Sequence, residues 1–242
     1  MKLWWVAVAL VACKKEPAKA PPVPPASAPV AAADATAADA ALATIELTRG
    51  VPVTVRVSST VNNRKILPKH IVDNDLGTAW NSATGELDGT WLDVELTGGG
   101  TIEQVRLTTG FTGYGPKHED YFTMNPRIAK VTVSADGGPP TTVALAPDRR
   151  DLQSIAVHAA KSVHIVIAEV VPGSKKSWRE VNVSELQVWG TPPAGWTPPA
   201  KPLVPTVFVA PRTADTPCAD IEKWQQDFME PIDWEAIHFQ TC

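Results

Sequence analysis

The sequence lacks an excess of positive charge, because 22 lysines and arginines stand against 26 aspartates and glutamates among its 242 residues. The formal net charge is −4. Proteins that bind nucleic acids neutralise phosphates with a basic surface. The charge balance therefore argues against nucleic acid as a partner.

Long hydrophobic runs are missing too. A membrane-spanning helix needs about 18 or more consecutive apolar residues, and no run in this chain approaches that length. An integral membrane protein is therefore not expected.

Motifs of the common enzyme classes are also missing. The chain contains no G-x-S-x-G, no H-E-x-x-H, no paired Cys/His metal spacing and no Gly-rich phosphate-binding loop. His118, Glu119 and Asp120 form an acid–base cluster, but a lone triplet of this kind is typical of a hydrated loop. We predict that the protein is not an enzyme. A cryptic hydrolase stays an alternative, because a carboxylate pair set across a cleft is not recognisable from sequence.

Proline and glycine are plentiful but unevenly placed. Fourteen of the 23 prolines lie within 17–29 and 192–217, whereas fourteen of the 15 glycines lie between 50 and 190. Glycine marks the turns of a folded body, and clustered proline favours extended chain. The sequence thus predicts one turn-rich domain at 44–190 and a Pro-rich linker at 191–217.

The Ala/Pro-rich segment 13–43 is predicted to be a disordered tether, because it cannot bury enough apolar surface to offset its ordering entropy. Its prolines favour polyproline II. The Ala-rich part at 31–43 could form a helix instead.

The N-terminus has the pattern of an export signal, with the short apolar run Leu3–Ala12 behind a basic residue. The letters LVAC at 10–13 resemble the lipobox of bacterial lipoproteins. This resemblance implies that residues 1–12 are removed as a signal peptide and that Cys13 is lipidated, which would anchor the protein to the membrane. Lys14, in place of an aspartate, favours the outer membrane. The alternative is an ordinary cleaved signal with an incidental cysteine.

Cysteine is scarce, and once Cys13 is set aside only Cys218 and Cys242 remain. An even pair in an exported chain predicts a disulfide, with two free thiols as the alternative. Between the two cysteines, apolar residues at helical spacing predict a short helix over 219–229. We therefore expect residues 218–242 to form a small, disulfide-closed tail.

The region 44–190 has the period-2 alternation of half-buried strands, and its fold class is predicted to be all-β. The spacing of the strands fits a β-sandwich or jelly roll. Trp80, Trp91 and Trp189 are expected in its core. The predicted strands are Val51–Val57, Trp91–Leu96, Ile102–Thr108, Ile128–Ser134, Thr142–Leu145, Gln153–Val157, Val163–Glu169 and Val183–Trp189.

Five segments of this region resemble discoidin domains, also called F5/8 type C or galactose-binding-like domains. Three carry the general resemblance: VDNDLGTAW at 72–80, GTWLDVEL at 89–96 and VSELQVWG at 183–190. YFTMNPRIAK at 121–130 and IAEVVPGSK at 167–175 are similar to the glycan-binding module of bacterial NAD-glycohydrolase toxins. The resemblance implies a discoidin-like jelly-roll β-sandwich that binds carbohydrate without catalysis. No segment resembles the NAD-cleaving domain.

The resemblance also implies a structural Ca²⁺ site and no catalytic cofactor. Asp73, Asp75 and Thr78 offer hard oxygen ligands within one turn, and the family adds a glutamate of the last strand, here Glu185. Asn74 stands where the family usually has glycine. The alternative is a turn whose carboxylates accept hydrogen bonds from backbone N–H groups.

Ligand-binding candidates lie in the loops, where aromatic and charged side chains suited to sugars are grouped. Tyr121 could instead be a packed aromatic residue, and Arg127 could hold the 110–122 loop rather than meet a ligand. The candidates are Arg64, Tyr114, His118, Tyr121, Arg127, Trp178 and Arg179.

These observations predict a membrane-anchored bacterial surface or periplasmic lipoprotein that binds a glycan or cell-envelope polysaccharide. The first alternative is a protein–protein interaction module, in which the loops and the 191–242 segment dock an envelope protein.

Overall fold

The computed structural model describes residues 43–210 and 237–239. The predicted signal peptide, the lipidation of Cys13 and nearly all of the tether lie outside these residues. So do the predicted 219–229 helix and both cysteines of the predicted disulfide, Cys218 and Cys242.

The regular secondary structure of the described chain is mostly strand, as its elements show in chain order. They are β1 (Ile45–Glu46), α1 (Leu47–Gly50), β2 (Val53–Val57), η1 (Pro68–Val72), β3 (Trp80–Asn81), β4 (Trp91–Leu96), β5 (Thr101–Leu107), α2 (Tyr121–Met124), β6 (Arg127–Ala135), β7 (Thr141–Ala144), β8 (Gln153–Ala159), β9 (Ser162–Val171), β10 (Asn182–Val183), β11 (Leu186–Thr191), β12 (Thr206–Val209) and β13 (Ile237–Phe239).

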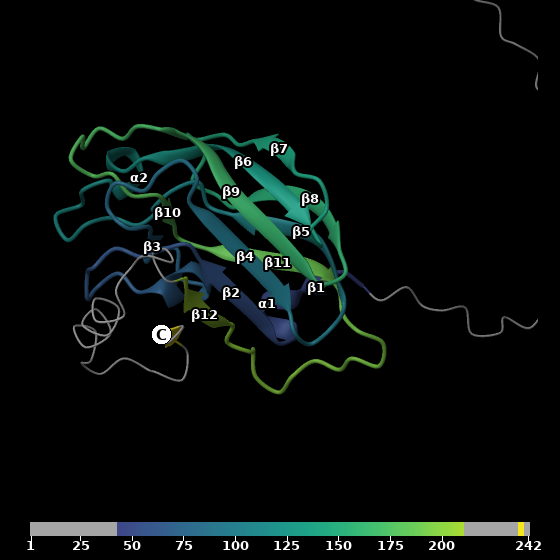
Figure 1. Ribbon diagram of the computed structural model, residues 1–242. Helices are drawn as coiled ribbons and strands as arrows, with labels where there is room; N and C mark the ends of the chain where they lie inside the picture. The colour runs from purple at the N-terminus through teal and green to yellow at the C-terminus, as the bar shows by residue number, and fades with distance from the viewer. Residues whose placement is uncertain (1–42, 211–236, 240–242) are drawn as a thin grey trace, which may run out of the picture. The chain divides into compact units, whose positions relative to one another are not determined.

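Two sheets form the sandwich (Figure 1). One has seven strands in the order β13-β12-β2-β4-β9-β6-β7, and the other has four in the order β1-β11-β5-β8. The short strands β3 and β10 pair separately. The all-β prediction and the sandwich are confirmed.

The core forms where the inner faces of the two sheets meet, because alternate residues of each strand point inward. Leu92, Val94 and Leu96 of β4 are buried, while the residues between them are half-buried. Ile102 and Leu107 of β5 are fully buried in the same cluster.

The pleat also corrects the prediction for two tryptophans. Trp80 is buried, and its indole N–H donates to the carbonyl of Ser59 at 2.9 Å. Trp91 and Trp189 are only half-buried, so their predicted core positions are wrong. Each follows the outward phase of its strand, and Trp189 lies under the Arg106 guanidinium, 4.1 Å from the ring centroid.

The segment expected to be a linker contains a strand of the larger sheet. Thr206–Val209 forms β12, which pairs in parallel with β2. Val207 and Val209 are buried there. Its four residues stand among prolines, so the pattern was too short to signal a strand. β13, which pairs in parallel with β12, was not predicted either.

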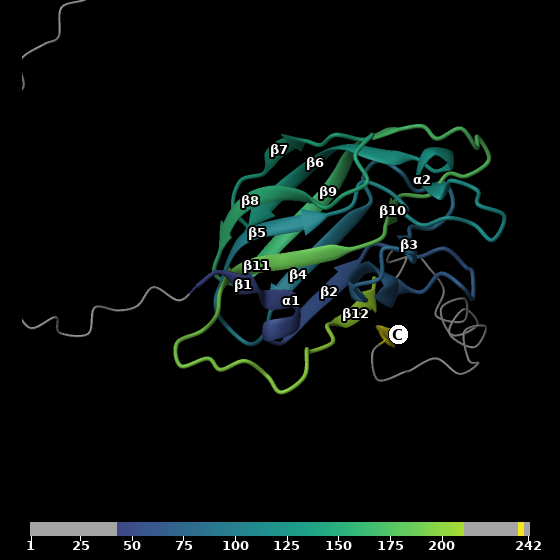
Figure 2. The ribbon, with the colours of Figure 1, turned by 180° about the vertical axis from the view of Figure 1, so that it is seen from behind.

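The connections that build the site lie at one end of the sandwich. Both views place α2, β3 and β10 at this end (Figures 1 and 2). Among the described residues, no helix is long and apolar enough to cross a membrane.

Candidate functional site

The first part of the site is the connection between β5 and β6, which includes α2 near its C-terminal end. Asp120 caps α2, because its carboxylate accepts the backbone N–H of Phe122 at 3.1 Å. Tyr114 and Asp120 form an isolated β-bridge across the loop. His118 lies exposed between them, with a positive φ of 61°.

Three aromatic rings join this loop to the segment after β9. Phe111 and Tyr121 have ring centroids 5.1 Å apart, and Tyr121 meets Trp178 edge-on at 5.7 Å. All three side chains are half-buried. Tyr121 is therefore a packed aromatic residue, as its alternative interpretation expected, and Trp178 is its partner.

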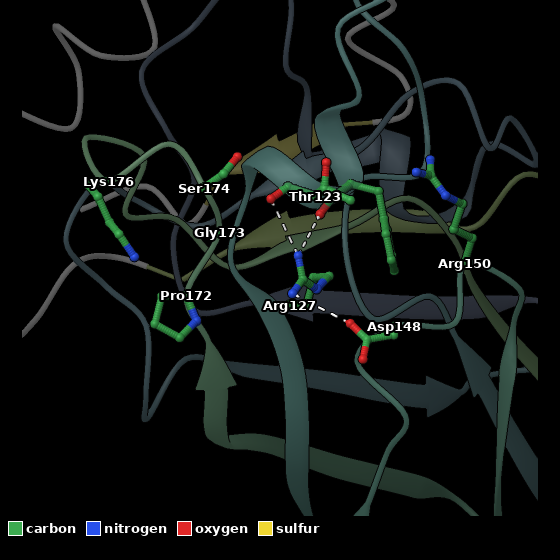
Figure 3. A pocket seen from close by; sticks show the side chains of 9 residues that line it. Thr123, Arg127, Asp148, Arg150, Pro172, Gly173, Ser174 and Lys176 are labelled. Atoms are coloured by element: carbon green, nitrogen blue, oxygen red, sulfur yellow. Dashed lines mark hydrogen bonds and ion pairs between the residues drawn. The ribbon is translucent and has the colours of Figure 1, made fainter.

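A pocket of about 500 Å³ opens beside this cluster (Figure 3). It lies among α2 with the start of β6, the β7–β8 connection and the segment after β9. Its lining consists of Phe122, Thr123, Arg127, Asp148, Arg150, Pro172, Gly173, Ser174 and Lys176.

Arg127 is the best-fixed charge in the pocket, with only 12% of its side chain exposed. Its Nη1 donates to the carbonyls of Phe122 and Thr123, both at 3.4 Å. Its Nη2 lies 3.6 Å from the carboxylate of Asp148. Arg127 thus holds α2, at the end of the 110–122 loop, and also lines the pocket, so its contact with a ligand stays a prediction.

Arg150 is the second pocket arginine. Its guanidinium lies 4.9 Å from the ring centroid of Phe122 and 5.2 Å from that of Tyr114. It also pairs with Asp120. Burial raises the pKa of Asp120, but hydrogen bonds from Arg150 and Thr123 outweigh this and hold that pKa below its usual value. Arg150 therefore ties the β7–β8 connection to the β5–β6 loop.

Gly173 allows the segment after β9 to approach α2 closely. A Cβ at this position would lie 2.1 Å from the carbonyl oxygen of Met124, so any side chain would displace backbone. The N–H of Ser174 donates to Thr123 at 3.0 Å, and that of Lys175 donates to Met124 at 3.1 Å. These bonds fix the segment that carries Lys176.

The structure brings together most, but not all, of the predicted ligand residues. Arg127, at the start of β6, lines the pocket, and Tyr121 lies in the adjoining α2. Tyr114 and His118 lie in the β5–β6 loop, and Trp178 lies in the segment after β9. Tyr114 is 63% exposed.

Two predicted residues stand apart from the pocket lining. Arg64 lies exposed on a separate turn, and within the described ranges its side chain forms no ion pair. Arg179 is exposed, and its backbone carbonyl accepts from Gly85.

Of the nine lining residues, only Arg127 was predicted from the sequence as a ligand residue, and the charged and aromatic side chains that were missed are Phe122, Asp148, Arg150 and Lys176. Two of them could have been found from the charged run Asp148-Arg149-Arg150-Asp151, which lies between two predicted strands.

The predicted metal turn forms a second charged feature. The carboxylate of Asp73 accepts from the N–H of Asp75 at 3.0 Å and from the hydroxyl of Thr78 at 2.8 Å. Asp75 accepts from the N–H of Gly77 at 2.8 Å. Asn74, with a φ of 62°, adopts the left-handed backbone that glycine would favour. These hydrogen bonds are those expected of the metal-free alternative.

Glu185 closes the turn from the strand side. It is 2% exposed, and it accepts the N–H of Asn74 at 2.7 Å. Burial is the main cause that raises its pKa to about 8, with a smaller contribution from the charge of Asp73. The oxygen donors of the turn suit a hard cation. In the described part of the chain, however, no cluster of three or more His, Cys, Asp or Glu side chains is placed to hold a metal.

Comparisons with known proteins agree with the fold. The family profile described as "NAD glycohydrolase translocation F5/8 type C domain" matches residues 47–189. A comparison with curated proteins finds no match.

Two solved structures illustrate the structural similarity. The family 32 carbohydrate-binding module of Clostridium perfringens NanJ, in complex with galactose, is 16% identical with a TM-score of 0.42. The match covers 58% of this chain and 98% of that one. The module CpGH89CBM32-5 of Clostridium perfringens, in complex with GalNAc-β-1,3-galactose, is 20% identical with a TM-score of 0.39. That match covers 56% and 94%. At these values neither structure decides what this chain binds.

Proposed function

Because the chain belongs to the NAD glycohydrolase translocation F5/8 type C domain family, we propose that its sandwich is a carbohydrate-binding module without catalytic activity. The observation that carries this proposal is the pocket at the loop end. Ligand pockets combine apolar or aromatic surface with a few fixed polar groups. Here Arg127 and the hydroxyl of Ser174 offer hydrogen-bonding groups, and the ring of Tyr114 lies nearby against Arg150.

The same pocket favours binding over hydrolysis. Glycoside hydrolases use two carboxyl groups set on either side of the scissile bond. The pocket lining contains one carboxylate, Asp148, which is paired with Arg127. A bound sugar would therefore meet hydrogen-bond donors rather than an acid–base pair.

A glycan array probed with the full-length chain tests the proposal. We expect binding to a defined class of sugars, and Tyr114→Ala should weaken it about tenfold, as the loss of an exposed aromatic contact would. Val204→Ala serves as the control, because Val204 is also exposed, at 72%, and lies outside the pocket lining. A folded protein that binds no glycan contradicts the proposal and favours an envelope protein as the partner.

A lipid anchor at Cys13 would give this module its location. We propose that the mature protein is tethered to the bacterial membrane, with the outer membrane favoured, and that many weak sites on one surface act together. Incorporation of radiolabelled palmitate into the full chain should be lost in Cys13→Ser. Equal labelling of both chains would contradict the anchor.

A structural Ca²⁺ at the acidic turn is the remaining proposal. Asp73, Asp75, Thr78 and Glu185 would hold it, and the ion would replace the proton that burial keeps on the carboxyl of Glu185. The ion would stabilise the loop end of the sandwich and would take no part in a reaction.

A further inference from the structure

The pocket is positively charged although the chain as a whole is acidic. Its lining contains Arg127, Arg150 and Lys176 against a single acid, Asp148. The formal charge of the whole chain is −4. A positively charged pocket on an acidic protein attracts anionic ligands, whereas it has little electrostatic effect on a neutral sugar. The positive charge of the lining therefore favours anionic ligands over neutral ones.

The three cations differ in how much of their charge is already paired. Arg150 is tied to Asp120, outside the lining. Lys176 is exposed, and within the described residues no carboxylate forms an ion pair with it. Figure 3 shows Arg127 between Lys176 and Arg150. The charge available to a ligand is thus concentrated at Arg127 and Lys176.

Asp148 pairs with Arg127 through its carboxylate and so shows where a carboxylate can approach this guanidinium. Its side chain is 91% exposed, and its distance of 3.6 Å from Nη2 of Arg127 is long for a charge-assisted hydrogen bond. An exposed pair of this kind is weak, because water screens it. Arg127 itself is held by two backbone carbonyls and by packing on Phe122, so it is ordered before a ligand arrives.

We infer that the pocket selects acidic carbohydrates, and that the carboxylate of a uronic or sialic acid displaces Asp148 from Arg127 and pairs with Lys176. This inference rests on the proposed carbohydrate-binding function and narrows its ligand class. The planar guanidinium matches a carboxylate better than it matches a sugar hydroxyl. Ser174 adds a hydroxyl to the lining, whereas the hydroxyl of Thr123 already donates to the carboxylate of Asp120 at 2.9 Å.

Isothermal titration of the full-length chain with matched acidic and neutral sugars tests this inference. The pairs are trigalacturonate with its methyl ester, and sialyllactose with lactose. In at least one pair, we expect the acid to bind about tenfold or more tightly than its neutral partner at low ionic strength. Added salt should reduce this preference, because it screens the charges.

Two variants assign the preference to the pocket. Lys176→Ala should lower the affinity for the acid several-fold, whereas Lys175→Ala, next to it but outside the lining, should leave it unchanged. Asp148→Asn should raise the affinity for the acid, because it removes the competing carboxylate. Neither side chain is part of the core, so the fold is kept.

The outcomes separate the inference from the function on which it rests. Equal affinity for acid and neutral sugar overturns acid selectivity but leaves carbohydrate binding in place. An equal loss in Lys176→Ala and Lys175→Ala also overturns it, because the effect would then be general charge. If the folded chain binds neither these sugars nor any glycan on the array, both proposals fail.

Discussion

The cationic pocket and the acidic turn at Asp73–Thr78 are both built from connections between strands, but they handle charge in opposite ways. In the pocket, Arg127 is held by neutral carbonyls, and Asp148, its acidic partner among the described residues, is exposed. In the turn, Glu185 is buried and its hydrogen-bond donor is a backbone N–H. The pocket thus holds a fixed positive charge, whereas burial in the turn keeps the carboxyl of Glu185 protonated up to a pKa of about 8. The first arrangement suits a ligand, and the second makes the free energy of unfolding depend on pH.

The largest effect is expected from pH, in EDTA, at Glu185. Its pKa is about 8 in the folded protein, above the ordinary value of 4.5. Between these values the unfolded chain has lost the proton and the folded chain keeps it. The free energy of unfolding should therefore fall as pH rises from about 4.5 to about 8, by on the order of 5 kcal/mol.

Glu185→Gln keeps an oxygen for the N–H of Asn74 and removes the titration. Urea unfolding at a series of pH values should show that this variant lacks most of the decline. Glu169→Gln is the control, because that carboxylate is half exposed. Equal slopes in wild type and Glu185→Gln would show that the turn does not hold the charge as described.

The next effect is that of Ca²⁺ on the same turn. A cation bound at Asp73 and Glu185 should raise the free energy of unfolding by about 2.7 kcal/mol at a hundredfold excess over its dissociation constant. Asp73→Asn should lose this response while keeping one oxygen acceptor. Thermal melts with Ca²⁺ and with EDTA measure it. Identical melts would leave the hydrogen-bonded, metal-free turn as the correct interpretation.

A smaller effect, confined to the pocket, is expected from Gly173→Ala. Its Cβ would force the 172–176 segment away from α2, because the nearest atom is a backbone oxygen at 2.1 Å. The cost should be about 1–3 kcal/mol, with loss of sugar binding.

Gly137→Ala is the comparison for that variant. Its φ is 72°, but nothing lies within 4 Å of its Cβ, so it should cost about 1 kcal/mol and leave sugar binding intact. Retained binding in Gly173→Ala would contradict the role of the close approach.

The strands could be predicted because the alternation of apolar and polar residues is visible within each short segment of sequence. All eight predicted strands find counterparts, although the last one divides into β10 and β11. The resemblance to the F5/8 type C domain of NAD-glycohydrolase proteins is also confirmed. β12 escaped because four residues among prolines carry too little pattern, and its place beside β2 depends on contacts distant in sequence.

The site was harder to predict because its residues come from three connections. Tyr121 and Trp178 were recognised separately, but only the fold shows that their rings pack together. Arg150 was missed because its importance lies in what it touches, Phe122, Tyr114 and Asp120, and no spacing encodes those contacts. Composition indicated that the loops were polar and aromatic, while the pairing of their charges required the structure.

The position of β1 has a mechanical consequence. Only two residues, Ile45 and Glu46, pair with β11, and Thr44 adds a hydrogen bond to Glu103 at 3.0 Å. Any force applied through the preceding residues meets this short pairing before it reaches the longer ladder between β2 and β4. β1 is therefore the first paired strand that such a force would load, and its two-residue pairing involves none of the residues that line the pocket.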